Sequence, residues 1–263
     1  MPIPPKDFIL PFVRKEQVAK DAWTFYFDRV KRDSAGPEDF DFLPGQYIRM
    51  TFDIMEPDER GTGRFFSITS SPLNKEYLTI TTRILQSAFK KTLASLSPGT
   101  DVKFFGPVGR FLLDEDDKRP RIFLAGGIGI TPFHSMLTYA SEKNLLLPIT
   151  LFVSFSTVEE IVFYDELQKI SEDHPNIKVI YTVTRPEVIP SAAFSTAGES
   201  EIDVWTGETG RISVDLIKKY APDFVSSLFY ISGPPMMVDA MLALVKEMGV
   251  PDEQVKKEKF VGY

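Results

Sequence analysis

The stretch "RIFLAGGIGITPF" (residues 121–133) joins two different kinds of local structure. Its first part is a compact, mostly apolar run of the kind that forms a strand buried on both faces. Three glycines follow, and Pro132 then begins a segment whose apolar residues recur at helical spacing. A buried strand that turns on glycines into a helix predicts one unit of a parallel α/β sheet.

The same alternation of strand and helix continues toward the end of the chain. The runs "PITLFV" (148–153), "IKVIYTV" (177–183) and "SLFYIS" (227–232) have the same compact apolar character, and a second clear helical pattern follows the last of them. The polar stretch 190–201 is typical of a surface loop. These features predict a doubly wound parallel sheet for residues 120–263.

The first part of the chain follows a different pattern. Short alternating runs separated by proline and glycine predict a series of strands, and the spacing of apolar residues predicts one helix over 87–96. Many short strands at this spacing predict an antiparallel β-barrel domain over residues 1–115, with the charged stretch "DEDDKRP" (114–120) as the linker. The runs expected to form strands are 23–30, 46–53, 64–68, 77–83 and 101–105.

Composition excludes several classes of function. The chain has 263 residues, no cysteine, two histidines and a formal net charge of -7. Iron–sulfur clusters and zinc sites held by thiolates of this chain are excluded, no metal site is expected, and the negative charge argues against nucleic-acid partners. The start of the chain lacks a signal-peptide pattern, and its longest apolar run (145–155) is short and broken by Pro148. We therefore expect a soluble cytoplasmic protein without membrane insertion.

The glycine turn after the first buried strand is a candidate phosphate site. Gly126, Gly127 and Gly129 let the backbone turn tightly and approach a ligand, and the amides at a helix start favour a phosphate. Thr131 can cap the helix and offer a hydroxyl group. The setting favours the phosphates of a dinucleotide; a glycine-rich connection without a ligand is the alternative.

The stretch "SGPPMM" (232–237) repeats this design at another strand end. Parallel α/β sheets bind ligands beyond the carboxyl ends of their strands, so both turns should face one crevice. We expect Ser232, Gly233 and Pro234 beside a nicotinamide, and Met236 and Met237 in the core. A plain helix start without a ligand is the alternative.

The stretch "RFFSITSSP" (64–72) reads as a short strand that begins with a guanidinium group and runs into four hydroxyl groups. A barrel edge with a solvated arginine and a serine turn has the same pattern. The other interpretation is a strand that holds a ligand, because a planar guanidinium group matches phosphate oxygens.

Several motifs in this order carry a resemblance. An antiparallel barrel with Arg-x-aromatic-Ser, then Gly-Gly-x-Gly-x-Thr-Pro, then Gly-Pro-Pro before a helix resembles the ferredoxin–NADP reductase superfamily. The resemblance runs from "PGQY" (44–47) to the C-terminus. It implies an FAD-binding barrel followed by an NAD(P)-binding α/β domain, with FAD as cofactor and NADH or NADPH as co-substrate.

The resemblance implies roles for the strand that begins at Arg64. The Arg64 side chain would pair with the flavin's phosphate, and Phe66, where the family usually has tyrosine, would lie against the isoalloxazine. Ser67 would lie near flavin N5 as a hydrogen-bond partner. Further polar contacts around the cofactor would come from Thr69, Ser70 and Ser71.

The next segment adds further expected cofactor contacts. A helix start at Ser87 matches the family segment that receives the FAD pyrophosphate, which favours FAD over FMN, and Thr82 and Phe89 flank it. Lys90 and Lys91 could add positive charge there. A lysine pair more often forms a solvated helix face, and we expect that arrangement here.

The C-terminal stretch "KKEKFVGY" (256–263) reads as a frayed tail or an edge strand. Family members often end with an acidic residue two places before an aromatic residue that covers the flavin, which matches Glu258 and Phe260. Tyr263 extends past this point and could reach the ring system or the adenine instead; Phe260 is favoured. Such an aromatic lid moves before nicotinamide can stack.

The end of the nucleotide that distinguishes NADH from NADPH has candidates in two segments, 153–167 and 184–187. Hydroxyl groups there could meet a ribose or a 2′-phosphate, whereas Glu159 and Glu160 oppose additional negative charge. The choice stays open, with a lean to NADH. The candidate residues are Ser154, Ser156, Thr157, Arg185 and Arg211.

Taken together, the sequence predicts a flavoenzyme that oxidises NAD(P)H and passes electrons to a separate ferredoxin or flavodoxin. Ser67 would orient flavin N5, Ser232 would help to place the dinucleotide, and Glu258 would assist proton or electron exchange. The alternative is a flavin-binding electron-transfer subunit of a larger complex. A plain dehydrogenase is weaker, since it leaves the barrel without a task, and a flavin-free binding protein is weaker still.

Overall fold

The computed structural model describes residues 3–33, 36–186 and 205–260. The chain divides into two compact units. We call residues 1–114 with 131–145 the barrel unit, and residues 115–130 with 146–263 the sheet unit.

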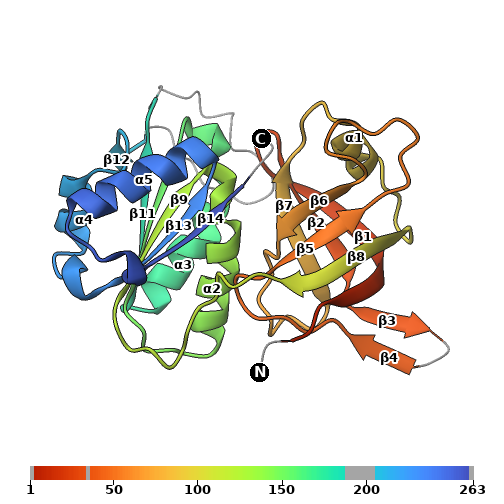
Figure 1. Ribbon diagram of the computed structural model, residues 1–263, viewed down its shortest axis with the longest axis horizontal. Coiled ribbons are helices and arrows are strands. Elements are labelled where there is room, and N and C mark those ends of the chain that lie inside the picture. Colours follow the sequence, from red (N-terminus) through yellow and green to blue (C-terminus); the bar gives the residue numbers. More distant parts are fainter. Residues whose placement is uncertain (1–2, 34–35, 187–204, 261–263) are drawn as a thin grey trace. The chain divides into compact units, whose positions relative to one another are not determined.

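The barrel unit is built on six antiparallel strands in the order β6-β5-β8-β1-β2-β7. Figure 1 shows these strands curling around a common interior. The antiparallel half expected from the sequence is therefore confirmed. The strands are β1 (Lys6–Ala19), β2 (Ala22–Asp28), β5 (Tyr47–Thr51), β6 (Gly63–Ser67), β7 (Tyr77–Arg83) and β8 (Asp101–Val108).

Smaller elements complete this unit. A separate hairpin pairs β3 (Val30–Asp33) with β4 (Gly36–Asp39). The expected helix is present as α1 (Ala88–Ala94), which begins where the Ser87 hydroxyl accepts a hydrogen bond from the Lys90 amide. Helix α2 (Thr131–Glu142) also belongs to this unit by its contacts.

The core of the barrel unit is rich in phenylalanine. Successive side chains of a strand point to opposite faces, so alternate residues of each strand enter the interior. Two aromatic residues expected to contact the flavin, Phe66 and Phe89, belong to this cluster. Its other phenylalanines are Phe8, Phe12, Phe25, Phe27, Phe40, Phe42, Phe52 and Phe104.

Strand β1 was not among the strands expected from the sequence. Pro11 interrupts its pattern, and the stretch from Arg14 to Gln17 is exposed and polar. Pro11 nevertheless lies in register with Asp101 of β8, and β1 pairs with β2 through two irregularities in register. A bulged strand of this kind does not show the regular alternation by which strands are recognised.

The sheet unit is a six-stranded parallel sheet in the order β12-β11-β10-β9-β13-β14. The parallel half expected from the sequence is confirmed. Of the two interpretations of the C-terminal stretch, the edge strand is correct: it forms β14 beside β13. The strands are β9 (Arg121–Gly126), β10 (Ile149–Phe155), β11 (Ile177–Val183), β12 (Glu208–Thr209), β13 (Leu228–Gly233) and β14 (Val255–Lys259).

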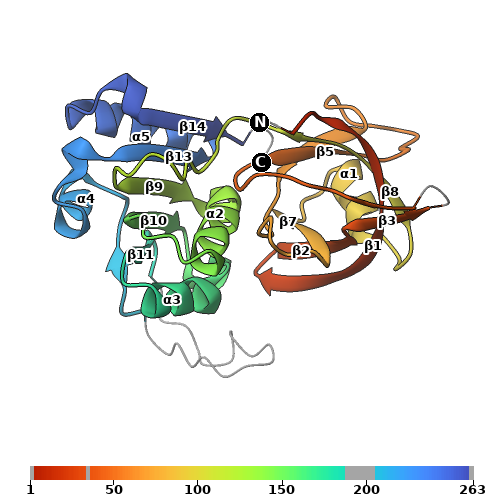
Figure 2. The same ribbon diagram turned by 90° about the horizontal axis from the view of Figure 1, so that it is seen from below.

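Helices cover both faces of this sheet. Helices α4 (Val214–Tyr220) and α5 (Pro235–Glu247) share one apolar cluster with the strands. Helix α3 (Tyr164–Asp173) lies on the opposite face, as Figures 1 and 2 show. Among the described residues, no helix is both long and apolar enough to cross a bilayer, and no group of potential ligands is arranged for a metal ion.

Some expectations about single segments need correction or remain open. Met236 is 87% exposed, so its expected place in the core is wrong, whereas Met237 packs against the apolar cluster of the sheet unit. Met236 follows Pro235 in the first turn of α5 and is exposed to solvent. The predicted surface loop 190–201 lies outside the described residues. The predicted domain limits, 1–115 and 120–263, stay a prediction.

The direction of the chain across the sheet reverses at β9, which pairs with β10 on one side and β13 on the other. The turn after β9, a short 3₁₀ helix η1 (Gly127–Ile130), therefore lies beside the end of β13. A β-carbon on Gly129 would lie 2.5 Å from both Gly233 Cα and the Ser232 carbonyl oxygen. Glycine is thus required at 129 because the two turns touch.

Replacing Gly129 by alanine should force these two turns apart. We expect a loss of about 3 kcal/mol in the free energy of unfolding, the upper range for overpacking. G126A is the matched control, because the three atoms nearest to its added methyl group would belong to the flexible side chain of Met237, at 3.0–3.5 Å. Equal stabilities of the two variants in urea unfolding would refute the requirement.

Candidate functional site

Strand β6 holds Arg64 and Phe66 on one face and Phe65 on the other. Arg64 and Phe66 are buried, each with 8% of its surface exposed, whereas Phe65 is 63% exposed. This is the alternation of a strand with one face toward the core. The solvated arginine of the alternative interpretation is therefore absent: the Arg64 side chain lies inside the unit.

Arg64 is held by the loop that precedes its strand. Its guanidinium group donates to the carbonyl oxygens of Arg60 at 3.1 Å and of Gly61 and Gly63 at 2.8 Å each. It also forms an ion pair with the carboxylate of Asp58, whose pKa it lowers. Its Nε atom is buried and has no hydrogen-bond partner among the described residues.

Two cations and two aromatic rings form a compact group beside this strand. The rings of Phe66 and Phe89 are 5.9 Å apart between centroids. The Lys90 amine lies 4.9 Å from the centre of the Phe66 ring, and the Arg64 guanidinium lies 5.2 Å from that of Phe89. We call Arg64, Phe66, Phe89 and Lys90 the cation–ring cluster. Each cation faces a ring, an arrangement that attracts it electrostatically.

Lys90 is buried, which contradicts the solvated position expected for it. Only 9% of its surface is exposed, and its amine donates to the hydroxyl of Thr82, which is itself fully buried. Burial, followed by the nearby charges of Arg60 and Arg64, lowers the pKa of Lys90 to about 7. Lys91 is exposed, as expected.

Helical spacing contained a signal for this difference. Lys90 is three residues before Leu93 and so shares its buried face, whereas Lys91 is two residues from both Phe89 and Leu93 and faces away. The two adjacent lysines therefore lie on opposite faces of α1.

The hydroxyl groups of the stretch 67–71 are all buried, but they have different partners. The Ser70 hydroxyl accepts from the Thr79 amide at 3.1 Å. The Ser71 hydroxyl accepts from the Leu73 amide at 3.2 Å and donates to the carboxylate of Glu142. The Thr69 hydroxyl has no partner among the described residues. Ser67 is buried at the end of β6.

Helix α2 is attached to the same stretch through its first turn. His134 Nδ1 lies 2.9 Å from the Thr69 carbonyl oxygen, and the Ser135 hydroxyl donates to the Ser70 carbonyl oxygen at 2.7 Å. Thr131 is the first residue of this helix. His134 and Ser135 thus fasten the first turn of α2 to the backbone of Thr69 and Ser70.

In the sheet unit, three strand ends bring predicted residues together. Ser232 of β13 lies in register with Ala125 of β9 on one side and with Glu258 of β14 on the other. Side chains in register on parallel neighbours share a face, so Ser232 and Glu258 are on the same face of the sheet. The Phe260 amide donates to the Gly233 carbonyl oxygen at 2.9 Å, which fixes the chain after β14 at the same turn.

The hydroxyl of Ser232 is completely buried and has no hydrogen-bond partner among the described residues. Gly126 is the last residue of β9, and Gly127, with a φ of 52°, is the first residue of η1. At the end of β13, Pro234 occupies the N-cap position of α5. The predicted glycine and serine sites therefore meet at one edge of the sheet. Tyr263 lies outside the described residues.

The candidates for the far end of the nucleotide lie at the ends of β10 and β11. The Arg185 amide donates to the Ser156 carbonyl oxygen at 2.9 Å, so these two residues are neighbours. The hydroxyl of Thr157 is buried and has no partner among the described residues. Arg185 and Arg211 are exposed.

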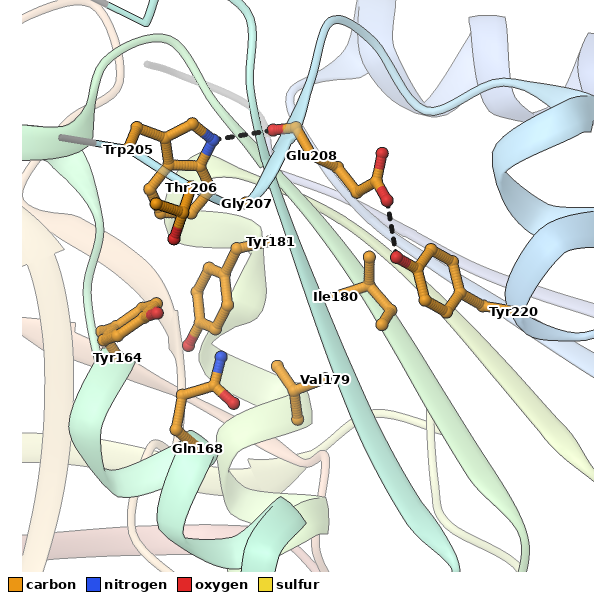
Figure 3. Close-up of a pocket in the computed structure, with 10 residues that line it drawn as sticks. All are labelled: Tyr164, Gln168, Val179, Ile180, Tyr181, Trp205, Thr206, Gly207, Glu208 and Tyr220. Carbon is orange, nitrogen blue, oxygen red and sulfur yellow. Dashed lines mark hydrogen bonds between the residues drawn. The ribbon is translucent and has the colours of Figure 1, made fainter.

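A cavity of about 440 Å³ straddles β11, the neighbour of the short edge strand β12. Figure 3 shows α3 on one side of it and Tyr220 of α4 on the other. The Glu208 carboxylate accepts from Lys219 at 2.6 Å and from the Tyr220 hydroxyl at 2.5 Å, so its charge is balanced within the fold. The lining consists of Tyr164, Gln168, Val179, Ile180, Tyr181, Trp205, Thr206, Gly207, Glu208 and Tyr220.

Comparison with known families agrees with this geometry. Residues 10–112 match the FAD-binding domain of oxidoreductases, and residues 123–242 match their NAD-binding domain. The chain belongs to the ferredoxin–NADP reductase superfamily. The two matched domains follow one another in the order that the motifs implied, and they account for FAD and a nicotinamide dinucleotide as cofactors.

Curated relatives of this superfamily member are longer proteins. The reductase component of propane 2-monooxygenase from Gordonia sp. is 26% identical over 233 residues, 88% of this chain and 62% of that protein. A component chain of the Na⁺-translocating NADH-quinone reductase of Klebsiella pneumoniae is 27% identical over 247 residues, 85% of this chain and 56% of that protein. The chain thus spans less than two thirds of either relative.

A solved structure shares the fold of this chain over nearly its whole length. The ferredoxin NADP⁺ reductase of Neisseria gonorrhoeae, crystallised with bound FAD and NADP, aligns with a TM-score of 0.72 and 20% identity. The alignment covers 97% of this chain and 98% of that one.

Replacing Asp58 by asparagine removes the carboxylate that Arg64 holds. Because the guanidinium group lowers the pKa of Asp58, the ionised carboxylate stabilises the fold above its ordinary pKa of about 4, and this contribution is lost as the pH falls below that value. We expect wild type to lose more stability than D58N between about pH 5 and about pH 3.

The measurement is urea unfolding of both proteins at each pH. D53N is the control, since the Asp53 side chain is 89% exposed and should leave the wild-type pH dependence unchanged. If D58N follows the wild-type curve throughout, the ion pair does not contribute to stability.

Proposed function

We propose that this chain is the flavin- and nicotinamide-binding part of a reductase, which takes electrons from NAD(P)H through FAD and delivers them to a separate acceptor protein. Such a reductase divides its work between two domains of the kind that this chain contains. When bound, FAD accepts a hydride and can release electrons singly. The chain's own task is then to hold and align the two cofactors.

Buried polar atoms without partners carry this proposal. Buried polar groups in proteins are nearly always hydrogen-bonded, so each exception needs a reason. Four of the five such side-chain atoms among the described residues are Arg64 Nε and the hydroxyls of Thr69, Ser232 and Thr157. All four belong to residues that the motifs had selected for contacts with FAD or the dinucleotide. The donor set fits polar ligands of this kind at these positions.

The proposed roles follow from the positions of the residues. Arg64 binds a phosphate of FAD in place of part of its contact with Asp58, Phe66 packs against the flavin, and Ser67 offers a hydrogen bond to N5. In the sheet unit, Ser232 contacts the nicotinamide and Glu258, one strand away, holds or accepts a proton. The glycines of η1 admit the dinucleotide's phosphates.

The acceptor of the electrons lies outside these 263 residues, because the chain has no cysteine to hold an iron–sulfur cluster. A ferredoxin or flavodoxin is the proposed carrier. The name of the Gordonia relative, a reductase component, supports an acceptor on another protein.

A second candidate function has its own support. The relative from Klebsiella is one component of an NADH-quinone reductase, which favours a flavin-binding electron-transfer subunit of a larger complex. Size exclusion of native extract separates the two: a single active species supports the reductase, and consistent co-migration with partner chains supports the subunit.

The deciding test is the absorption spectrum of the purified chain, with the released cofactor identified by mass. We expect a flavin spectrum that belongs to FAD and that bleaches when NADH or NADPH is added without oxygen. A protein that binds no flavin, and consumes neither nucleotide with a dye acceptor, would refute the proposal.

Replacing Ser232 by alanine should separate function from stability. An unpartnered buried hydroxyl contributes nothing to the fold, so we expect an unchanged or higher Tm, together with flavin reduction by NAD(P)H that is slower by about tenfold. S135A is the stability control, because Ser135 is equally buried but hydrogen-bonded, and its loss should cost about 1 kcal/mol. A lower Tm for S232A with an unchanged reduction rate would show that Ser232 serves the fold.

A further inference from the structure

Lys90 is the one buried amine of the cation–ring cluster, and the proposed chemistry does not use it. Among the described residues, its Nζ atom makes a single hydrogen bond, to Thr82, and no ion pair. A buried lysine is rare unless it is paired, because removing an ammonium group from water is costly. Its position calls for an explanation.

Two charged groups act on the Lys90 amine from other elements. Arg64 lies on β6 and Arg60 on the loop before β6, and both are cations that disfavour a charged Lys90. Asp58, the carboxylate of that loop, is paired with Arg64. On its own helix, Lys91 faces away into solvent. The surroundings of the amine therefore carry an excess of positive charge.

Arg64 and Lys90 are connected through the two rings they face. The guanidinium lies against Phe89, the amine against Phe66, and these rings touch each other. An anion that reaches Arg64 thus arrives within the same small cluster as the Lys90 amine. A pyrophosphate carries two charges, which two cations can match.

We propose that Lys90 is a second cationic ligand of the FAD pyrophosphate, beside Arg64, and that its amine takes up a proton as the cofactor binds. The inference rests on the proposed function, since it needs FAD at Arg64. It adds a residue and a proton-coupled step to that site. Above about pH 7, binding converts an uncharged, buried amine into an ion-paired ammonium group.

The direction of the pH dependence follows from linkage. In the chain alone, the pKa of Lys90 is about 7 because of burial and the two arginines. A nearby anion raises the pKa, so the bound state holds the proton more firmly than the free state. Below about pH 7 the amine is protonated in both states and affinity is constant. Above it, FAD affinity falls by about tenfold per pH unit, because each binding event must take up a proton.

A purely structural lysine makes a different prediction. Replacing a buried, unpaired amine with methionine, which has a similar shape, would then stabilise the fold and leave FAD affinity unchanged. The two explanations are therefore separable by binding rather than by stability.

The experiment titrates FAD into the full chain freed of bound flavin, at pH values from about 6 to about 9, for wild type, K90M and K91M. Calorimetry in buffers of different ionisation enthalpy counts the protons taken up. For wild type we expect uptake that approaches one proton per FAD near pH 8, with the loss of affinity stated above. K90M should bind FAD about a hundredfold more weakly than wild type at pH 6, which is the loss that wild type itself reaches near pH 9. The affinity of K90M should not depend on pH, and its binding should take up no proton. K91M, which lies on the solvated face, should match wild type.

Riboflavin, which has the same ring system and no phosphate, is the ligand control. If K90M weakens riboflavin as much as FAD, Lys90 supports the ring and the inference is wrong. Proton uptake by wild type tests it even if K90M does not fold, and K90Q provides a second variant. If wild type binds FAD without proton uptake, the inference alone is refuted; if wild type binds no FAD at any pH, the proposed function is refuted as well.

Discussion

No side chain fits between Gly129 and Gly233, because the backbone of the turn after β9 is in contact there with the end of β13. The contact exists because β13 pairs directly with β9, although a large part of the sheet unit lies between them in sequence. Once that pairing is made, β14 joins the same edge, and Glu258 comes one strand away from Ser232. A single feature of strand order thus gathers three distant segments. Gly129 and Gly233 lack side chains, and this allows the turn after β9 and the end of β13 to come close enough to bind one ligand together.

The barrel unit depends on a constraint of another kind, the burial of positive charge. Arg64 is compensated by Asp58 and by carbonyl oxygens of its own loop, so its burial is stable without a ligand. Lys90 has a hydroxyl partner and a ring, which do not balance a full charge. A methionine at this position would fit the same space at lower cost. An arrangement that gives up stability in this way is typical of sites that are completed by a ligand.

Most of the fold could be predicted because its strands show clear periodicity. The four central parallel strands are compact apolar runs. Most of the barrel strands show alternating buried and exposed residues and are bounded by turn residues. Strand β1 could not be found in this way, because Pro11 and a polar, exposed second half conceal its pattern. The ion pair between Arg64 and Asp58 was equally hidden, since it joins a strand to an irregular loop whose path only the tertiary structure reveals. Lys90 was misjudged for a different reason: its spacing from Leu93 was informative, but the adjacent Lys91 suggested a solvated pair.

The structure also separates residues that the motif treats alike. Of the consecutive hydroxyls after β6, those of Ser70 and Ser71 accept hydrogen bonds from backbone amides and so maintain the turn. The Thr69 hydroxyl does not, among the described residues, and its carbonyl oxygen is contacted by His134 of α2. A substitution at Ser70 therefore acts first on the fold and only through it on a ligand. The Thr69 hydroxyl is therefore available to a cofactor. The Thr69 backbone is held in place by helix α2, which begins at Thr131. The motif thus identifies the segment, and the hydrogen bonds within the fold show which of its side chains remain able to bind a ligand.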